Sequence, residues 1–569
     1  MPIHSGARIF VESLLREKVE VVFGYPGGKV IPLYDELYDA PIKHILVRHE
    51  QGAAHAADGY ARSTGKVGVC IATSGPGATN LVTGLATAYM DSVPVVAFTG
   101  QAPTSLIGTD SFQEIDIRGI TLPVTKHNYM VTNVKDLAKT IKEAFYIART
   151  GRPGPVLVDL PVDVLKSHAD FMYPQSVHLP GYQPTYEGNY MQIKLAAEAI
   201  NTSQRPVIFA GGGVINSNAS EELTNMAIKG RIPVVTSLMG LGAFPEDHEL
   251  SLKMLGMHGT MYANYAISEA DLIIGIGVRF DDRVTGKLET FAPYAKIIHI
   301  DIDPAEVNKN VKVDIPIVGN AKNVLDKLIP LIKAIERKEW LEKIKEWKRR
   351  FPLNYEYDDN SIKPQYLIEK LDELTDENTV IVTEVGQNQM WAAQYFHFSK
   401  PRSFITSGGL GTMGYGLPAS MGVQVGNPDK TVINISGDGS FQMNLQELAT
   451  ISSNRLPVKI IILNNGTLGM VRQWQELFFD ERYSATILEN PNFVKLAQAY
   501  GIKSLRIDQT NDVEMALKEV LNYDGPVLLD VIIPQDENVF PMVPEGASIN
   551  EMLELKKKKR EKEKQGEVA

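Results

Sequence analysis

The chain has 569 residues, too many for a single hydrophobic core, so we expect about two to four domains, with three the most natural division. A composition of 44% hydrophobic and 22% charged residues excludes a disordered or fibrous protein. A net charge of −11 argues against nucleic-acid binding, and the single cysteine, Cys70, cannot form an internal disulfide, which favours a reducing cytoplasm.

The ends of the chain and its uncharged stretches carry no clear targeting signal. The first residues lack the basic-then-apolar pattern of an export peptide. The uncharged stretches 67–90 and 403–428 are interrupted by Gly, Pro, Ser and Thr, so we expect no membrane span. The charged C-terminal tail, 551–569, contains the Lys-rich run 556–564; a membrane or nucleic-acid tag is one interpretation, but mixed charge favours a solvated terminus.

Short β-branched runs alternate with longer amphipathic stretches, which predicts an α/β fold with parallel sheets. The runs predicted as strands are 93–99, 155–160, 206–210, 272–277, 296–300, 380–383, 431–436, 458–463 and 527–533. The polar segments 172–189 and 333–364 resemble linkers. They predict three domains at 1–180, 190–350 and 360–550. A weak sequence echo between the outer two domains fits a common origin for them.

Two features of the first two domains are weak signals by themselves. Glu50 follows a predicted strand and opens a helix rich in small residues. A glutamate there is ordinarily explained by its favourable interaction with the helix dipole. Gly211, Gly212 and Gly213 follow the predicted strand 206–210 and would let the backbone approach a pyrophosphate closely.

The third domain carries a stronger signal. The predicted strand 431–436 ends in Gly437-Asp438-Gly439-Ser440, and the strand 458–463 ends in Asn464-Asn465-Gly466-Thr467. Ligands of open α/β sheets bind at such carboxyl ends. The Asp438 carboxylate, the Asn465 carbonyl and a main-chain carbonyl near Thr467 are hard oxygen ligands suited to Mg²⁺ together with a diphosphate. Either turn alone would be an ordinary tight turn, but the pair predicts a metal–diphosphate site.

This pair of turns resembles the thiamine-diphosphate (ThDP) motif, and further stretches narrow the resemblance to the acetohydroxyacid synthase, or acetolactate synthase, large catalytic subunits. The resemblance covers essentially residues 5–545. The matching stretches are Phe-Gly-Tyr-Pro-Gly-Gly at 23–28, Arg-His-Glu-Gln-Gly-Ala at 48–53, Thr-Ser-Gly-Pro-Gly-Ala-Thr-Asn at 73–80, Ile-Gly-Thr-Asp-Ser-Phe-Gln-Glu at 107–114 and Thr-Lys-His-Asn-Tyr at 125–129.

The resemblance implies a pyrimidine-binding first domain and a diphosphate- and Mg²⁺-binding third domain. Glu50 would drive the cofactor's aminopyrimidine toward its imino form, which removes the thiazolium C2 proton. Glu50, Gly28 and Gln113 would be catalytic, and Asp438, Asn465 and Thr467 would bind Mg²⁺. The implied ThDP contacts are Glu50, Pro76, Asn80, Gly386, Gln387, Asn388, Gly411, Met413, Gly437, Asp438, Gly439, Ser440, Asn465, Gly469 and Met470.

The middle domain resembles that of the FAD-containing synthases through its run Arg279-Phe280-Asp281-Asp282-Arg283. The flavin would be structural. The implied FAD contacts are Arg152, Gly211, Gly212, Gly213, Met257, His258, Gly259, Arg279, Asp281, Arg283, Asp301 and Asp303. The implied substrate residues are Phe112, Gln113, Arg283, Val471 and Trp474, with the Arg283 guanidinium suited to a ketoacid carboxylate.

The implied activity joins two ketoacids. Pyruvate would lose CO₂ on ThDP, and the hydroxyethyl carbanion would add to a second pyruvate or to 2-ketobutyrate, giving 2-acetolactate or 2-aceto-2-hydroxybutyrate for branched-chain amino-acid biosynthesis. The resemblance also implies a homodimer or tetramer and a separate small regulatory subunit. Another ThDP enzyme, such as pyruvate oxidase or a 2-ketoacid decarboxylase, stays an alternative, as does a catalytically silent paralogue.

Three positions depart from the family pattern. Asn388 stands where many members carry His, so one diphosphate contact would be neutral. Val162 stands where many carry Lys, which puts a charged contact near the active-site entrance in doubt. Thr467 replaces a bulkier residue, but only its main-chain carbonyl is needed.

Overall fold

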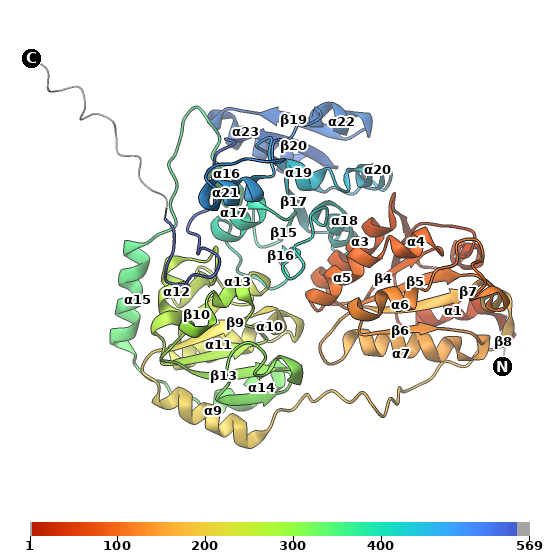
Figure 1. The fold of residues 1–569 in the computed structure, drawn as a ribbon, viewed down its shortest axis with the longest axis horizontal. Helices are drawn as coiled ribbons and strands as arrows, with labels where there is room; N and C mark the ends of the chain where they lie inside the picture. Colours follow the sequence, from red (N-terminus) through yellow and green to blue (C-terminus); the bar gives the residue numbers. More distant parts are fainter. Residues whose placement is uncertain (1–2, 555–569) are drawn as a thin grey trace, which may run out of the picture.

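The structure, a computed structural model, describes residues 3–554; the Lys-rich run 556–564 of the predicted tail lies outside this part. Three six-stranded parallel sheets, each flanked by helices, form the frame of the molecule (Figure 1). The predicted α/β class is confirmed. Two short strands, β1 (Ile3–Ser5) and β8 (His168–Asp170), form an antiparallel pair. They lie before and after the stretch of chain that forms the first sheet.

The first sheet has the strand order β3-β2-β4-β5-β7-β6. Its strands are β2 (Val21–Gly24), β3 (Lys43–Leu46), β4 (Gly68–Ala72), β5 (Val95–Gln101), β6 (His127–Met130) and β7 (Val156–Pro161). The accompanying helices are α1 (Gly6–Arg16), α2 (Ile31–Tyr38), α3 (Glu50–Thr64), α4 (Pro76–Thr79), α5 (Val82–Met90), α6 (Ile117–Thr121), α7 (Leu137–Arg149) and α8 (Val162–Lys166).

The second sheet has the order β11-β10-β9-β12-β13-β14. Its strands are β9 (Pro206–Ala210), β10 (Val234–Thr236), β11 (Ser251–Met254), β12 (Leu272–Ile276), β13 (Lys296–Asp301) and β14 (Ile315–Val318). Its helices are α9 (Tyr190–Thr202), α10 (Gly212–Asn216), α11 (Ser220–Gly230), α12 (Met261–Glu269), α13 (Asp282–Thr285), α14 (Ala321–Leu328) and α15 (Lys338–Arg350).

The third sheet has the order β16-β15-β17-β18-β20-β19. Its strands are β15 (Thr379–Thr383), β16 (Phe404–Ile405), β17 (Thr431–Gly437), β18 (Lys459–Asn464), β19 (Lys503–Ile507) and β20 (Val527–Ile532). Its helices are α16 (Pro364–Glu373), α17 (Gln387–Tyr395), α18 (Gly416–Gly426), α19 (Asp438–Phe441), α20 (Leu448–Ser453), α21 (Gly469–Phe478), α22 (Phe493–Ala499) and α23 (Val513–Asn522).

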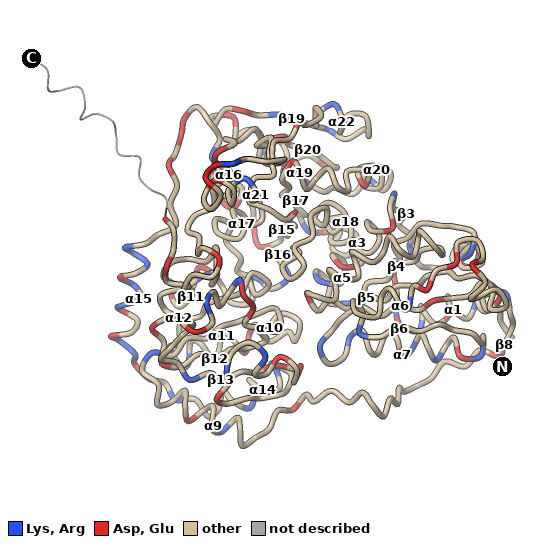
Figure 2. Tube along the Cα trace, in the orientation of Figure 1, with Lys and Arg blue, Asp and Glu red and all other residues tan. Residues whose placement is uncertain are grey.

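The central strands are apolar because helices cover both faces of each parallel sheet. Every residue of β12 and of β18 is buried, although β18 begins with a lysine. Where an element reaches the surface, its pattern changes. Along α15, at the outer edge of the molecule, Lys and Arg alternate with Glu (Figure 2), while Trp340, Leu341 and Ile344 face inward. Each helix among residues 3–554 is too short or too polar to span a membrane.

The first and third domains pack through α3 and α18, whose backbones come unusually close. A Cβ at Gly59 would lie 2.3 Å from the carbonyl oxygen of Ala419, and one at Gly422 would lie 1.8 Å from that of Ala56. Only glycine allows this approach. The contact therefore fixes how the helix that begins at Glu50 sits against the third domain.

Candidate active site

Asp438 and Asn465 lie side by side at the carboxyl edge of the third sheet. The parallel pairing of β17 with β18 aligns Gly437 with Leu463, so the turns that follow the two strands are neighbours. Asp438 is 1% exposed, and Nδ2 of Asn490 donates to its Oδ2 at 2.5 Å. Burial raises the pKa of the Asp438 carboxyl to about 6, although the hydrogen bond from Asn490 opposes this.

The surroundings of Asp438 fit a divalent cation. Within residues 3–554, no Lys, Arg or His pairs with this carboxylate. Thr467, which is 2% exposed, donates its backbone N–H to Oδ1 of Asn465 at 3.1 Å, so this amide oxygen and the 465–467 turn are fixed next to the carboxylate. A buried carboxylate beside amide oxygens is a donor set that Mg²⁺ accepts.

The other predicted diphosphate-site residues converge on the same turns. Gly386, with a φ of 146°, leads into α17, and Gln387 accepts a 3.4 Å hydrogen bond from Nδ2 of Asn465. Gly469 leaves no space, since a Cβ there would lie 2.1 Å from Oε1 of Gln387. A Cβ at Gly439 would lie 3.9 Å from the methyl group of Met413, so Met413 reaches the Gly-Asp-Gly turn. Ser440 donates its hydroxyl to the carbonyl of Gly437.

We call the turns 437–440 and 464–467, with Gly386, Gln387 and Gly469, the metal–diphosphate cradle. Asn388 adjoins the cradle, and its side-chain oxygen, not its amide nitrogen, faces it. Its Nδ2 donates to the carbonyl oxygens of Glu384 (3.1 Å) and Ile435 (2.9 Å), while its Oδ1 points toward Gly386 and Gly437. The expectation of a neutral diphosphate contact at Asn388 stays a prediction. The amide hydrogens are used inside the protein, so the side chain offers a phosphate no donor in this arrangement.

Glu50 belongs to a separate group in the first domain. It is 9% exposed and accepts a hydrogen bond from Nδ2 of Asn80 at 2.9 Å. A Cβ at Gly77, in the helix that Pro76 begins, would lie 3.1 Å from Oε1 of Glu50. No atom lies within 4 Å of a Cβ placed at Gly28, so open space adjoins this group. Gln113, whose φ is 60°, packs against Gly75 at the edge of the same group.

The two groups are connected only indirectly within one chain. Glu447 of the third domain accepts the backbone N–H groups of Arg48 and His49, each at 3.0 Å, and so fixes the turn before Glu50. In the described part of the chain, no hydrogen bond or ion pair joins Glu50 to Asp438, Asn465 or Thr467. The structure thus places the predicted acid–base residue and the predicted metal ligands in two clusters.

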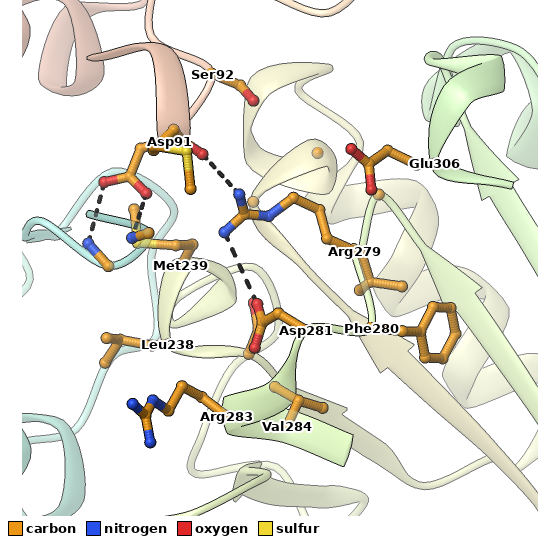
Figure 3. Close-up of a pocket in the computed structure, with 18 of the residues that line it drawn as sticks. Asp91, Ser92, Leu238, Met239, Arg279, Phe280, Asp281, Arg283, Val284 and Glu306 are labelled. Carbon is orange, nitrogen blue, oxygen red and sulfur yellow. Dashed lines mark hydrogen bonds and ion pairs between the residues drawn. The ribbon is translucent and has the colours of Figure 1, made fainter. Parts of the chain in front are cut away.

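A cavity of about 870 Å³ lies where the second domain meets the other two (Figure 3). Its volume is in the range of cofactor sites. Of the predicted flavin contacts, Gly211, Gly259 and Asp303 do not line it, whereas Arg152, Gly212, Gly213, Met257, His258, Arg279, Asp281, Arg283 and Asp301 do. Gly386, Gly411 and Met470 also line it, so the cavity reaches the metal–diphosphate cradle.

The cavity wall fits a polar ligand such as a flavin nucleotide. Arg152 pairs with Asp303 at 3.2 Å and with Glu306 at 2.6 Å, which places a guanidinium from the first domain at the rim. Nδ1 of His258 and Oε2 of Glu306 are buried without hydrogen-bond partners among the described residues. Such atoms are costly unless a ligand or water satisfies them.

Two of the three glycines after β9 pack tightly against the backbone of Gly277. A Cβ at Gly211 would lie 2.2 Å from the carbonyl oxygen of Gly277, and one at Gly213 would lie 2.6 Å from the Cα of Gly277. Gly212 has looser surroundings, at 3.3 Å from Met239. The predicted reason, backbone approach to a pyrophosphate, is therefore not needed to explain Gly211 and Gly213.

The predicted substrate residues also divide between the clusters. The Arg283 guanidinium lies 6.0 Å from the centre of the Trp474 ring, and both line the cavity. Val471, on the same helix as Trp474, is 49% exposed. Phe112 is 82% exposed on a loop of the first domain, and Gln113 follows it. Arg283 and Trp474 are thus together, while Phe112 and Gln113 stand apart from them within one chain.

Sequence reasoning missed several residues that shape these clusters. Glu384, fully buried, accepts the N–H groups of Gly414 (2.8 Å) and Leu417 (3.1 Å) on either side of the turn after Met413. Its place directly after a buried strand is the signal that identified Asp438, so it could have been found. Asn490 and Glu447 lie in no motif, and their roles depend on tertiary contacts.

Comparisons with known proteins cover nearly the whole chain. Models of thiamine pyrophosphate enzymes match at 4–120 (N-terminal TPP binding domain), 193–328 (central domain) and 384–531 (C-terminal TPP binding domain). A probable acetolactate synthase large subunit of Methanocaldococcus jannaschii is 54% identical, covering 96% of this chain and 95% of the relative. The acetolactate synthase large subunits of Corynebacterium glutamicum (52%; 96% and 89%) and Buchnera aphidicola (49%; 98% and 100%) are similar as well.

Proposed function

The chain belongs to the acetolactate synthase large subunits, a family of thiamine-diphosphate-dependent carboligases, and from this premise we propose that it joins pyruvate to a second pyruvate or to 2-ketobutyrate. The products would be CO₂ with 2-acetolactate or with 2-aceto-2-hydroxybutyrate, which enter branched-chain amino-acid biosynthesis. One observation carries the proposal: the metal–diphosphate cradle opens into the cavity that holds Arg283 and Trp474.

The cradle supports the assignment of Mg²⁺ and the diphosphate. Asp438, Asn465 and the carbonyl of Thr467 would hold the metal, and Met413 would press on the cofactor from the side of Gly439. Bound thiamine diphosphate supplies a nucleophilic carbon and an electron sink for decarboxylation. Glu50, held by Asn80, would exchange a proton with the pyrimidine ring as a general acid–base residue.

FAD is proposed as a third, structural cofactor. The cavity volume, the Arg152 and Arg279 guanidinium groups and the unsatisfied atoms of His258 and Glu306 support it. At the other end of the cavity, Arg283 would bind the carboxylate of the incoming ketoacid, and the Trp474 ring would favour the larger 2-ketobutyrate.

We further propose a cytoplasmic homodimer, or a tetramer built from dimers. The separation of Glu50 from Asp438 within one chain supports sites completed by two subunits. The exposed Phe112 and the open space at Gly28 support it too, because another surface is needed to enclose them. The relatives' description as large subunits supports a separate small regulatory subunit.

Product analysis tests the proposal directly. Purified protein would receive pyruvate, with and without 2-ketobutyrate, while ThDP, Mg²⁺ or FAD is omitted in turn. We expect acetolactate formation that needs all three cofactors, and aceto-hydroxybutyrate as the main product when both ketoacids are present. Acetate or acetaldehyde as the main product would contradict the carboligation. Full activity in FAD-free protein would contradict the flavin assignment alone.

A further inference from the structure

The three domains meet at Asp91, the residue that caps the C-terminus of α5 (Figure 3). Its Oδ2 accepts the backbone N–H of Gly408 at 3.0 Å, and its Oδ1 accepts that of Gly409 at 2.6 Å. From the second domain, Nη1 of Arg279 donates to the carbonyl of Met90 at 2.8 Å. One short stretch of the first domain thus binds a loop of the third and an arginine of the second.

Asp91 is itself held rigidly. The Arg62 guanidinium bridges Asp58 (2.5 Å) and Asp91 (2.8 Å), and the side chains are 8%, 0% and 0% exposed respectively. The Tyr415 hydroxyl donates to Asp58 at 2.6 Å. Buried, charge-assisted hydrogen bonds of this kind are strong and directional. The carboxylate of Asp91 therefore has little freedom to follow a movement of the loop.

The loop 407–414 is tightly packed at Gly409. A Cβ at Gly409 would lie 2.7 Å from Oδ1 of Asp91 and 3.1 Å from Nη2 of Arg279. The hydroxyls of Thr87 and Thr412 form a second link between the first and third domains, at 2.7 Å. The position of the loop is therefore set jointly by the first and second domains.

This loop lies beside both proposed cofactor sites, at the place where the cavity and the cradle meet. Residues 407–411 line the large cavity together with Arg279 and Asp281, whereas Met413, two residues further on, reaches the Gly-Asp-Gly turn of the cradle. A ligand in the cavity would contact residues 407–411, and a ligand in the cradle would contact Met413.

We propose that Asp91 is a positioning residue that couples the two sites. A flavin that packs against Arg279 and residues 407–411 stabilises the loop in the position that presents Met413 to thiamine diphosphate. This inference rests on the proposed function, which assigns both cofactors. Because coupling between two ligands is reciprocal, each cofactor must then tighten the binding of the other by the same factor.

The first test uses the unmodified full-length protein with Mg²⁺. Calorimetry gives the Kd of ThDP with and without FAD, and quenching of flavin fluorescence gives the Kd of FAD with and without ThDP. We expect both to tighten by an equal factor, on the order of tenfold. FAD binding that leaves the Kd of ThDP unchanged would overturn the coupling alone. Protein that binds no FAD would overturn the cofactor assignment and the coupling with it.

Two variants locate the coupling. Asp91→Asn keeps the shape, but it removes one of the two charges that hold Arg62 and leaves one side-chain oxygen in place of the two that accept the N–H groups of Gly408 and Gly409, so it should reduce the coupling factor to near unity. Thr87→Val removes the link to Thr412, together with the hydrogen bond from the Thr87 hydroxyl to the carbonyl of Thr83 in the same helix, and should reduce the coupling factor partly. The matched control is Asp39→Asn, since Asp39 caps the C-terminus of α2 but is exposed.

The control should keep the full coupling factor. Thr87→Val leaves the ion pairs of Arg62 intact. If Asp91→Asn fails to fold, the coupling factor of Thr87→Val is compared with that of the unmodified protein instead. Coupling that is undiminished in the folded variants would overturn the role of the Asp91 junction.

Discussion

Glu50 and Asp438 each follow a strand of a six-stranded parallel sheet, yet the chain supplies very different surroundings to the two. Neighbouring strands bring Asp438, Asn465 and Gln387 together inside one domain. Around Glu50, by contrast, Gly28 faces open space and Phe112 is exposed. A cradle for a phosphate and a metal can be built by one sheet, whereas the acid–base side needs a second surface.

The largest expected effect separates catalysis from binding. Glu50→Gln removes a transferable proton but keeps the shape, so kcat should fall by roughly 10²–10⁴-fold. The ThDP affinity should change only a few-fold, because Glu50 lies outside the cradle. Steady-state kinetics and calorimetry measure the two quantities. Glu20→Gln, at a surface ion pair with Lys66, is the control. Equal losses in kcat and in ThDP affinity would contradict the assignment of catalysis to Glu50 and of cofactor binding to the cradle.

The corresponding substitution in the cradle, Asp438→Asn, should weaken cofactor binding. Asp438→Asn removes the one carboxylate proposed to bind Mg²⁺, so the affinity for Mg²⁺ and ThDP should fall on the order of 100-fold or more. Activity should partly return at high Mg²⁺ concentration. Calorimetric titration of Mg²⁺ at saturating ThDP checks this. An unchanged Mg²⁺ affinity would show that the metal binds elsewhere.

The third effect concerns how the folding stability of the third domain depends on pH through Glu384. Burial raises the pKa of the Glu384 carboxyl from 4.5 to about 7, although backbone N–H groups of Leu417 and Gly414 oppose this. The folded state then holds a proton that the unfolded state releases between these pH values, so stability falls as pH rises from about 4.5 to about 7.

A Glu384→Gln variant should lack this slope. Between pH 5 and pH 8, the unmodified protein should lose up to about 3 kcal/mol of unfolding free energy relative to the variant. Denaturant titrations at both pH values measure the difference. Glu373→Gln, at a surface ion pair of the same domain, should behave like the unmodified protein. Parallel pH profiles for Glu384→Gln and the unmodified protein would contradict the buried, protonated state.

The smallest expected effect tests most directly whether Glu50 and Asp438 of different subunits form one active site. A dimer made of one Glu50→Gln subunit and one Asp438→Asn subunit, purified by two different tags, carries one intact site if sites form between subunits. It should recover about half of the normal activity per dimer, although both parent homodimers are nearly inactive. If each site formed within one chain, both sites of the mixed dimer would be damaged and no activity would return.

Local sequence signals determined much of this protein by themselves. Alternating apolar runs predicted the parallel sheets, and the two turns after β17 and β18 predicted the neighbouring Asp438 and Asn465, because parallel strands end at a common edge. The roles expected of Glu50, Arg283 and Trp474 came from the family resemblance, since a helix-opening glutamate or a lone tryptophan carries no specific signal.

Only the tertiary structure decided how distant segments meet. The inward turn of the Asn388 amide depends on carbonyls of two other segments, and the packing of Gly211 depends on Gly277. The junction of Asp91 with Gly408 and Gly409 joins residues more than 300 positions apart. Such contacts follow from the packing of whole domains, which no local pattern of charge or hydrophobicity encodes.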